Sequence, residues 1–533
     1  MPEQLVDTFF TIAAGPHGEQ TGFVVQGNRV ARYGWASGRV LDRTYVTLGR
    51  KWPNLPEAFQ AGLDAALTTP ADDPWTLVFR GPQCLRLHPL LGTVAEVGTI
   101  AARFPGLPAE FASGVDAALP GTGANQVFLF RGGRCVLYDT RIPAVVETKS
   151  LADMWPGLQS KAPAFANGIS AATLDPGKGE FHFFRGTQFT KGVLATRTIT
   201  LNATTIDDTS WPGLVGALSA GFLYVGGGWR VTRIFDLDTR RVVEELPIDT
   251  YNQMERTVAT GPDGRYLYLS SSYQSKTCVD TTTRTGVAQI PNEWGLNGGM
   301  AFSPDGNRLH LVYFVRGNGD AHLDTYRAGS FERLGRIPLQ LDGTTPPTGH
   351  WPSPVVAASD DRTVFIGRGS IVFEVDVHSQ KVRQGFHPNH GEIMDLALSP
   401  DDRTLTIANG TNGTFALDTY TGQVVRNRIL PDCMRLESTP NRTELYCIPS
   451  THPASLPIAD PTSHRELHEI RFPGSASPSE AVFSPSGEFA YVESVSGEDT
   501  KSLAVIDVAA HRMVDFFPMP GIVRVTAIAY SPY

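Results

Sequence analysis

Cysteine is scarce in this sequence, and the apolar runs that membrane helices need are missing. Its 533 residues include five cysteines and no CxxC pair: Cys84, Cys135, Cys278, Cys433 and Cys447. Because they are few and odd in number, we expect buried or free thiols in a reducing compartment, without a disulfide framework. No apolar run approaches the roughly 18 residues of a membrane span, and the N-terminus lacks the regions of a secretion signal. These absences predict a soluble, cytoplasmic protein without a membrane partner, and leave a non-classical route of secretion open.

The motifs of common cofactor and hydrolase chemistry are also missing. The sequence contains no P-loop, no GxGxxG after a strand, no GxSxG, no HExxH and no EF-hand loop. Its net charge is −9 without any block of like charges, which argues against a nucleic-acid partner. We therefore expect no organic cofactor and no nucleic-acid binding. What the sequence does contain is 53 Gly and 39 Pro, which favours many turns over long helices.

A first repeat occupies the N-terminal part of the chain. A short stretch of aromatic, Pro, Gly or Asn, and Leu occurs four times, at 52–55, 104–107, 155–158 and 211–214. Each copy follows an apolar run that ends in a turn, as in "TLVFRG" at 76–81 and "VFLFRG" at 127–132. Each repeat unit is therefore predicted to form a sheet of three or four short strands. Such a sheet cannot bury both of its faces unless the units stack around an axis. The aromatic residue before Pro is suited to packing between such units.

These motifs resemble hemopexin repeats over residues 1–217. The resemblance rests on "DAA" in the inner strand, "FRG" at the hairpin and "FPGLP" before a short helix, and it implies a four-bladed β-propeller. The first unit is the most degenerate, and neither the first nor the last unit has the cysteine with which secreted relatives close the ring. The family's axial tunnel often holds structural ions near the starts of the inner strands. The matching positions are Asp7, Asp64, Asp116 and Ser170; alternatively, the Asp side chains hold hydrogen bonds between blades.

A second repeat, marked by "SPDG" or a variant before an apolar strand, fills residues 218–533. Six copies are complete, at 260–270, 302–313, 358–367, 398–408, 438–448 and 483–493. The seventh is split, because the chain ends on an inner strand at 525–533 and the matching outer strands stand at 221–243. This pattern resembles YVTN-type and WD-repeat-like seven-bladed propellers. We therefore predict an all-β chain of two fused propellers, four-bladed over 1–217 and seven-bladed over 218–533, the second closed by the C-terminal strand.

The inner strands of the second array predict a cluster of charge. Counting back from each turn, alternate positions should face the axial channel. Asp395, Arg435 and Glu480 then lie at one level on three successive blades, with Glu437 below Arg435. Such a network could clamp a polar ligand or act in acid–base chemistry. The alternative is a water-filled channel whose charges satisfy one another. Glu255 and Asn297 occupy the next channel level.

The rim of the second array carries an aromatic residue and histidines at equivalent positions. Trp294, His350 and His390 fall on consecutive blades, and Glu392 follows His390 closely. This arrangement fits a ligand mouth with an aromatic wall and titratable side chains. A metal site is a second interpretation, and solvated loop residues are a third.

Three functions are compatible with this sequence. The first is binding of a small molecule or a protein partner at a propeller mouth. The second is an enzyme of lyase, cyclase or hydrolase type in specialised metabolism, with Asp395, Arg435 and Glu480 in acid–base roles beside Trp294 and His390. The third is a structural component of a toxin-like assembly. Fold alone does not decide among them, and the expected non-protein component is at most a structural ion in the four-bladed channel.

Overall fold

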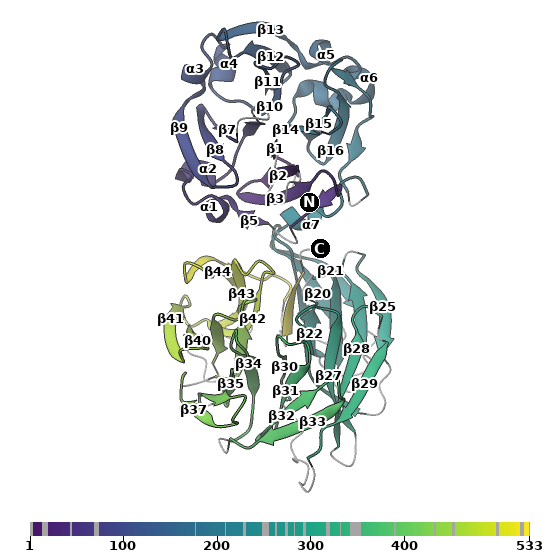
Figure 1. Ribbon diagram of the computed structural model, residues 1–533, viewed down its shortest axis with the longest axis vertical. Helices are drawn as coiled ribbons and strands as arrows, with labels where there is room; N and C mark the ends of the chain where they lie inside the picture. Colours follow the sequence, from purple (N-terminus) through teal and green to yellow (C-terminus); the bar gives the residue numbers. More distant parts are fainter. Residues whose placement is uncertain are drawn as a thin grey trace. The chain divides into compact units, whose positions relative to one another are not determined.

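The computed structural model is all-β and divides into two compact units, Met1–Ser219 and Ala220–Tyr533, here called unit 1 and unit 2 (Figure 1). The residues it describes are 4–12, 20–42, 45–68, 74–175, 177–207, 209–226, 231–247, 255–261, 264–271, 276–281, 283–290, 295–315, 320–330, 332–341, 353–388, 391–410, 412–430, 433–449, 454–496, 500–522 and 527–531. Among these residues, no helix has the length and the apolar character needed to cross a membrane.

The described part of unit 1 forms four antiparallel sheets, A to D, with short helices between them. Sheet A holds β1 (Thr8–Ile12), β2 (Thr21–Gln26), β3 (Arg29–Gly34), β4 (Arg39–Val40) and β5 (Val46–Thr47), and sheet B holds β6 (Ala65–Thr68), β7 (Thr76–Arg80), β8 (Gln83–His88) and β9 (Thr93–Thr99). Sheet C holds β10 (Ala117–Pro120), β11 (Gln126–Arg131), β12 (Arg134–Asp139) and β13 (Ala144–Ser150), and sheet D holds β14 (Ala171–Asp175), β15 (Glu180–Arg185), β16 (Gln188–Val193), β17 (Thr198–Ile199) and β18 (Thr204–Thr205). The helices are α1 (Leu48–Lys51), α2 (Glu57–Gln60), α3 (Ile100–Arg103), α4 (Ala109–Ala112), α5 (Leu151–Met154), α6 (Leu158–Lys161), a 3₁₀ turn (Pro163–Asn167) and α7 (Leu214–Leu218).

The aromatic residue of each repeated motif is buried between two sheets of unit 1. Trp52 packs with residues of sheets A and B, and Phe104 with residues of sheets B and C. Trp155 packs with sheets C and D, and Trp211 with sheets D and A. The expectation that these residues pack between repeat units is therefore confirmed. A large flat side chain in each gap lets a sheet bury a face that it cannot bury alone.

The first strand of each sheet in unit 1 lies toward the middle of the unit. β1 and β10 each neighbour both β6 and β14, and Figure 1 shows β1, β10 and β14 in the middle with β9 and β13 outside. The Ala pairs that open β6 and β10 are buried (Ala65, Ala66, Ala117 and Ala118). Small side chains allow these strands to approach one another closely.

The described part of unit 2 forms seven four-stranded antiparallel sheets. The first three hold β19 (Phe222–Gly226), β20 (Val231–Asp236), β21 (Arg241–Pro247) and β46 (Ala527–Ser531); β22 (Glu255–Thr260), β23 (Tyr266–Ser271), β24 (Lys276–Asp280) and β25 (Thr285–Ile290); and β26 (Gly295–Phe302), β27 (Arg308–Val315), β28 (Ala321–Arg327) and β29 (Arg333–Pro338). The next two hold β30 (Val355–Ala357), β31 (Thr363–Arg368), β32 (Ile371–Asp376) and β33 (Lys381–Phe386); and β34 (Asp395–Leu398), β35 (Thr404–Ala408), β36 (Thr414–Asp418) and β37 (Val424–Asn427). The last two hold β38 (Arg435–Ser438), β39 (Leu445–Ile448), β40 (Ser455–Asp460) and β41 (Arg465–Arg471); and β42 (Ser477–Phe483), β43 (Phe489–Ser496), β44 (Thr500–Asp507) and β45 (Arg512–Pro518).

The "SPDG" marker forms the turn between the first two strands of a sheet. The Ser303 hydroxyl donates to the Asp305 carboxylate at 2.6 Å, and the Arg308 amide donates to Ser303 Oγ at 2.9 Å. Gly306 adopts φ +73°, which a residue without a Cβ does at little cost. In the copy at 398–408, Ser399 bonds Asp401 and the Thr404 amide in the same way. The hydrogen bonds within the turn thus explain why the same residues recur in each copy of the repeat.

The C-terminal strand completes a sheet that begins at the start of unit 2. β46 pairs antiparallel with β19, with Phe222 opposite Ser531 and Gly226 opposite Ala527. The split seventh repeat predicted from the sequence is therefore confirmed. The first strands also neighbour one another in series: β46 with β22, β22 with β26, β26 with β30, β30 with β34, β34 with β38, and β42 with β46. An ion pair between Arg435 and Glu480 links β38 to β42.

Gly221 allows the two ends of unit 2 to meet, and its substitution should loosen this closure. It has φ +89°, and a Cβ there would lie 2.5 Å from Tyr530 Oη and 2.7 Å from the Ser531 carbonyl oxygen. We expect Gly221→Ala to lower the free energy of unfolding of unit 2 by about 1–3 kcal/mol, measured by urea denaturation. Gly286→Ala is the matched control, because its Cβ would have only ordinary contact with Thr277. Equal stabilities for the two variants would contradict this account.

Candidate functional site

A cluster of charged side chains lies on the first strands of three consecutive sheets of unit 2. Asp395 begins β34, Arg435 begins β38, and Glu480 lies in β42. In β38 the apolar side chain of Leu436 is buried against the core. Because strand residues alternate between faces, Arg435 and Glu437 point to the opposite side. The structure therefore brings together Asp395, Arg435, Glu437 and Glu480, four of the residues that the sequence predicts to face a channel.

Asp395 fastens two neighbouring sheets of this cluster. Its carboxylate accepts hydrogen bonds from the amides of Leu396, at 2.8 Å, and Leu436, at 2.9 Å. Burial raises the pKa of Asp395 to about 6, although the two amides and the positive charge of Arg435 act in the opposite direction. Both of its oxygens are engaged with main-chain donors. These two bonds hold β38 in register beside β34.

Arg435 forms an ion pair with Glu480 across the next gap. One terminal nitrogen of Arg435 contacts both carboxylate oxygens of Glu480. The Glu480 side chain is 9% exposed, whereas that of Arg435 is 43% exposed, so the guanidinium remains accessible from solvent. Burial raises the pKa of Glu480, and the neighbouring Arg435 charge only partly opposes this.

Glu437 is the carboxylate of the cluster that remains available. In the described part of the chain no hydrogen bond to its carboxylate is found, and the residue is partly exposed. Its pKa is raised to about 8, mainly by burial and also by the negative charges of Asp395 and Glu480, while the positive charge of Arg435 acts in the opposite direction. Glu437 therefore holds a proton near neutral pH and releases it when a positive charge approaches.

Two members of the cluster were missed in the sequence. Glu493 in β43 stands directly opposite Glu480 and is fully buried, with Lys501 Nζ 3.3 Å from its Oε1. Burial raises the pKa of Glu493 to about 7, and Lys501 opposes this shift. A signal was present, because a glutamate follows three apolar or aromatic residues in "AYVE" at 490–493. Counting back from each turn reaches positions on first strands only, so this second-strand position is not predicted.

The combined arrangement is acidic and able to exchange protons. Four carboxylates, those of Asp395, Glu437, Glu480 and Glu493, face two cations, Arg435 and Lys501. Carboxylates that titrate near neutral pH can bind a cation or serve as acid and base. No group of three His, Cys, Asp or Glu suited to holding a metal ion occurs among the residues that the structure describes.

The other ligand residues expected in unit 2 contribute little to this geometry. Trp294, His350 and His390 lie outside the described residues. Glu392 is exposed. Glu255 begins β22 and Asn297 lies in β26, but their side chains are outside the described part. The mouth formed by Trp294 and the two histidines stays a prediction.

The Asp residues at the strand starts of unit 1 hold hairpins within their own sheets. Asp64 accepts from Arg80 at 2.6 Å and from the Gly81 amide at 2.6 Å. Asp116 accepts from Arg131 and the Gly132 amide in the same way, and Asp7 accepts from the Gly27 amide. The bonds between sheets come instead from hydroxyls, from Thr8 to the Leu63 carbonyl and from Ser170 to the Val6 carbonyl. These carboxylates are already engaged, so an ion at this end would need main-chain oxygens as ligands.

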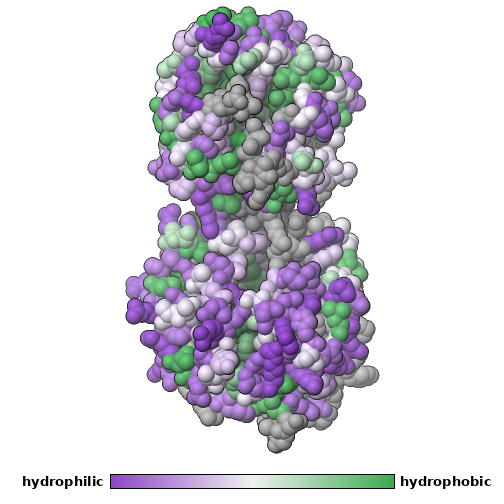
Figure 2. All heavy atoms as spheres, viewed as in Figure 1, coloured by the Kyte–Doolittle hydropathy of each residue, from purple (hydrophilic) through white to green (hydrophobic). Residues whose placement is uncertain are grey.

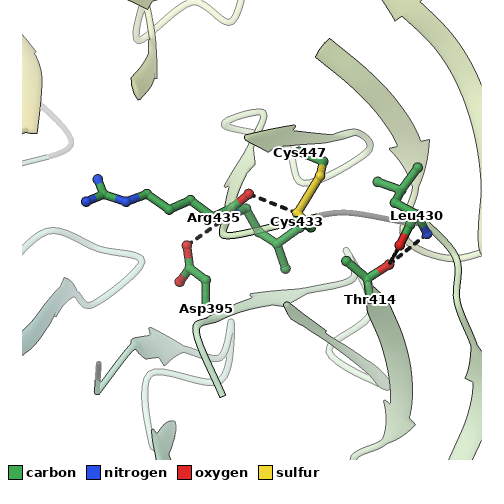
Figure 3. The surroundings of a disulfide bond; sticks show 7 residues. Asp395, Thr414, Leu430, Cys433, Arg435 and Cys447 are labelled. Carbon is green, nitrogen blue, oxygen red and sulfur yellow. Dashed lines mark hydrogen bonds between the residues drawn. A yellow bond between two sulfur atoms is a disulfide. The ribbon is translucent and has the colours of Figure 1, made fainter. Parts of the chain in front are cut away.

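A disulfide between Cys433 and Cys447 lies next to the cluster, and it corrects the expectation that all five cysteines are free (Figure 3). Cys433 precedes β38 and Cys447 lies on the adjacent antiparallel strand β39, so their Cα atoms are 5.6 Å apart, within the range that a disulfide spans. Cys433 Sγ lies 3.1 Å from the Arg435 carbonyl oxygen. Cys84, Cys135 and Cys278 are free and buried. The cysteine argument for a reducing compartment is thereby weakened.

Reduction of this disulfide should destabilise unit 2. It closes a loop with a sequence separation of 14, and loops of this size are expected to contribute about 3 kcal/mol. We expect dithiothreitol to lower the unfolding midpoint of the wild-type protein in urea, and to leave unchanged that of a Cys433→Ala, Cys447→Ala double variant. An identical wild-type midpoint with and without reductant would show that the bond does not stabilise the unit.

Raising the pH should destabilise unit 2 through Glu437. Its pKa in the folded protein, about 8, lies above the ordinary value of 4.5, so the folded form keeps a proton that the unfolded chain releases. This stabilisation is fully present below about pH 4.5 and is lost as the pH rises through 8. Glu437→Gln cannot ionise, so we expect it to be more stable than wild type at pH 8.5 and similar at pH 4.5, by calorimetry. Glu466→Gln, on the exposed part of β41, should show no such pH-dependent difference.

Three solved structures resemble part of this chain. No protein-family model and no curated protein matches it. Among solved structures, a 2S albumin seed protein from Dolichos is 23% identical over 40% of this chain and 99% of its own, with a TM-score of 0.35. A hemopexin-fold protein from cow pea is 21% identical over 40% and 98%, with a TM-score of 0.35. A plant albumin from Cicer arietinum that shows hemagglutination is 18% identical over 40% and 97%, with a TM-score of 0.35.

Proposed function

We propose that the two units are β-propellers, four-bladed over residues 1–217 and seven-bladed over 218–533. In unit 1 this is supported by the aromatic residues that pack between sheets in cyclic order, A with B, B with C, C with D, and D with A. In unit 2 it is supported by the pairing of β46 with β19 and by the series of neighbouring first strands. Each first strand would then line a central channel.

We further propose that the channel of unit 2 binds a small cationic ligand. The observation that carries this proposal is the carboxylate of Glu437, which has no hydrogen-bonded partner in the described chain and stands beside the Arg435–Glu480 pair. With every group ionised, Asp395, Glu437 and Glu480 outnumber the single cation among them, Arg435. An ammonium or guanidinium group would supply the missing positive charge and make charge-assisted hydrogen bonds.

Proton release should accompany this binding. The free protein keeps a proton on Glu437 near neutral pH, because burial and neighbouring carboxylates raise its pKa to about 8. A bound cation favours the ionised carboxylate and therefore lowers that pKa. Affinity should consequently rise with pH up to about 8 and then level off.

Acid–base catalysis is the second candidate, and a specific observation favours it. The pKa of Asp395 is raised to about 6 and that of Glu437 to about 8, so at neutral pH one carboxyl is mainly ionised and the other mainly protonated. Carboxyls separated in this way can act as base and acid in one reaction. This agrees with an enzyme of lyase, cyclase or hydrolase type that uses no organic cofactor.

Calorimetric titration with simple probes tests the binding proposal. We expect butylammonium or methylguanidinium to bind the wild-type protein, and 1-butanol, which lacks the charge, not to bind. Glu437→Gln should weaken binding of the cation at least tenfold at pH 8, because the acceptor loses its charge. Glu466→Gln is the matched control and should bind as wild type does. Equal affinity in Glu437→Gln and wild type would refute the proposal.

The catalytic candidate differs in what happens to the bound compound. In a binder, NMR spectra of ligands bound to the protein stay unchanged over hours. In an enzyme, a bound compound is converted, and both Asp395→Asn and Glu437→Gln lower the rate of conversion. Catalysis would be favoured by a rate that falls at acidic pH, as Asp395 becomes protonated, and at basic pH, as Glu437 loses its proton.

A further inference from the structure

One end of unit 1 holds a cavity of about 830 Å³, where its inner strands begin. Its lining is mainly polar, and it includes the last residue of the second strand in sheets B, C and D: Arg80, Arg131 and Arg185. By contrast, hydrophobic residues (green) are interspersed with hydrophilic ones (purple) on the face of unit 1 shown in Figure 2. The cavity therefore favours a ligand that forms hydrogen bonds over an apolar one.

In sheets B and C, the arginine and the glycine that follows it hold a carboxylate of the same sheet. Arg80 Nη1 donates to one oxygen of Asp64 at 2.6 Å, and the Gly81 amide donates to the other oxygen at 2.6 Å. The equivalent donors of sheet C hold Asp116 at 2.5 and 2.7 Å. Guanidinium and amide thus form a donor pair that matches the two oxygens of one carboxylate.

Sheet D keeps the donor pair but lacks the carboxylate. Ser170 occupies the position of the Asp, and its hydroxyl donates to two main-chain carbonyl oxygens. Arg185 Nη1 donates to the Gly168 carbonyl oxygen at 2.8 Å, which leaves its other guanidinium donors available. In the described part of the chain Arg185 forms no ion pair and the Gly186 amide has no acceptor, and both residues line the cavity.

The carboxylate of the neighbouring sheet A does not serve this donor pair. Asp7 accepts from the Gln4 side-chain amide at 2.6 Å and from the Gly27 amide at 2.5 Å. Both of its oxygens are therefore engaged within its own part of the fold. Sheet A has no arginine at the end of its second strand, where Gln26 stands instead. Arg185 is thus the arginine of this lining that has no carboxylate of its own.

We propose that Arg185 and the Gly186 amide bind the carboxylate of a small hydrophilic acid, such as a hydroxy acid or a sugar acid, whose other atoms lie in the cavity. The bound carboxylate would complete in sheet D the arrangement that Asp64 and Asp116 complete in sheets B and C. Its hydrogen bond from the guanidinium is charge-assisted. The polar lining offers donors and acceptors to the hydroxyl groups of such an acid.

The first test compares two ligands that differ only in the carboxylate. We expect D-gluconate to bind the full-length protein in a titration followed by saturation-transfer NMR, and D-glucitol, which has a hydroxymethyl group in place of the carboxylate, to bind more weakly. Arg185→Gln should weaken gluconate roughly tenfold or more and leave glucitol unchanged. Arg134→Gln removes the same charge from an exposed pair with Glu110 outside this cavity, and should change neither.

A second pair of variants fills the donor pair from within the chain. Ser170→Asp should abolish gluconate binding, because its own carboxylate would occupy Arg185 and Gly186 as Asp64 does in sheet B. Ser170→Ala loses the same hydroxyl bonds without adding a carboxylate, so it should bind gluconate as wild type does. Glu437→Gln should also bind as wild type does, which keeps this test independent of the proposed site in unit 2.

Three results would overturn the proposal. The first is no binding of gluconate to the wild type at concentrations up to about 10 mM. The second is equal affinity for gluconate in wild type and Arg185→Gln, and the third is equal affinity in Ser170→Asp and Ser170→Ala. Equal affinity of the wild type for gluconate and glucitol would overturn the assignment of the carboxylate to this donor pair.

Discussion

A four-stranded antiparallel sheet has two faces, and neither can be buried unless another element packs on it. Unit 1 meets this constraint with one aromatic side chain in each gap between sheets, as at Trp155, which packs against the phenylalanines of sheets C and D. Unit 2 meets it by using its last strand, β46, to complete the sheet of β19. Since the first strands approach one another, the side chains they present meet from distant parts of the chain. The contact of Arg435 with Glu480, across two sheets, exists for this reason.

The sequence predicted those features that repeat or alternate. The "SPDG" turns and the split last sheet could be found because each copy places Ser, Asp and Gly at the same spacing, and alternation along a strand was enough to place Arg435 and Glu437 on the face opposite Leu436. Features that depend on pairing between strands could not be found. Glu493 became part of the cluster through its register with Glu480, and Cys433 meets Cys447 because β38 and β39 run antiparallel. Neither register can be counted along one strand.

The cluster in unit 2 is costly to the fold that contains it. Buried carboxylates lose hydration, and the pKa values of Asp395, Glu437 and Glu493 are raised as a result. Apolar residues at these positions would avoid this cost. Asp395 recovers part of it through two main-chain amides, and Glu480 through Arg435, whereas no hydrogen bond to the Glu437 carboxylate is found among the described residues. Groups kept at the expense of stability are those for which a functional reason should be sought, and Glu437 is therefore the centre of the proposed site.

The four inner strands of unit 1, β1, β6, β10 and β14, begin with similar residues and end with different ones. At the starts, Asp64 and Asp116 serve the hairpin of their own sheet by accepting the glycine amide and the arginine of the turn. These hydrogen bonds explain why an Asp recurs at this position of the repeat. Among the described residues no such bond recurs at the strand ends, where β6 and β10 finish on Thr68 and Pro120. In a repeat, positions without a shared structural role can differ from copy to copy.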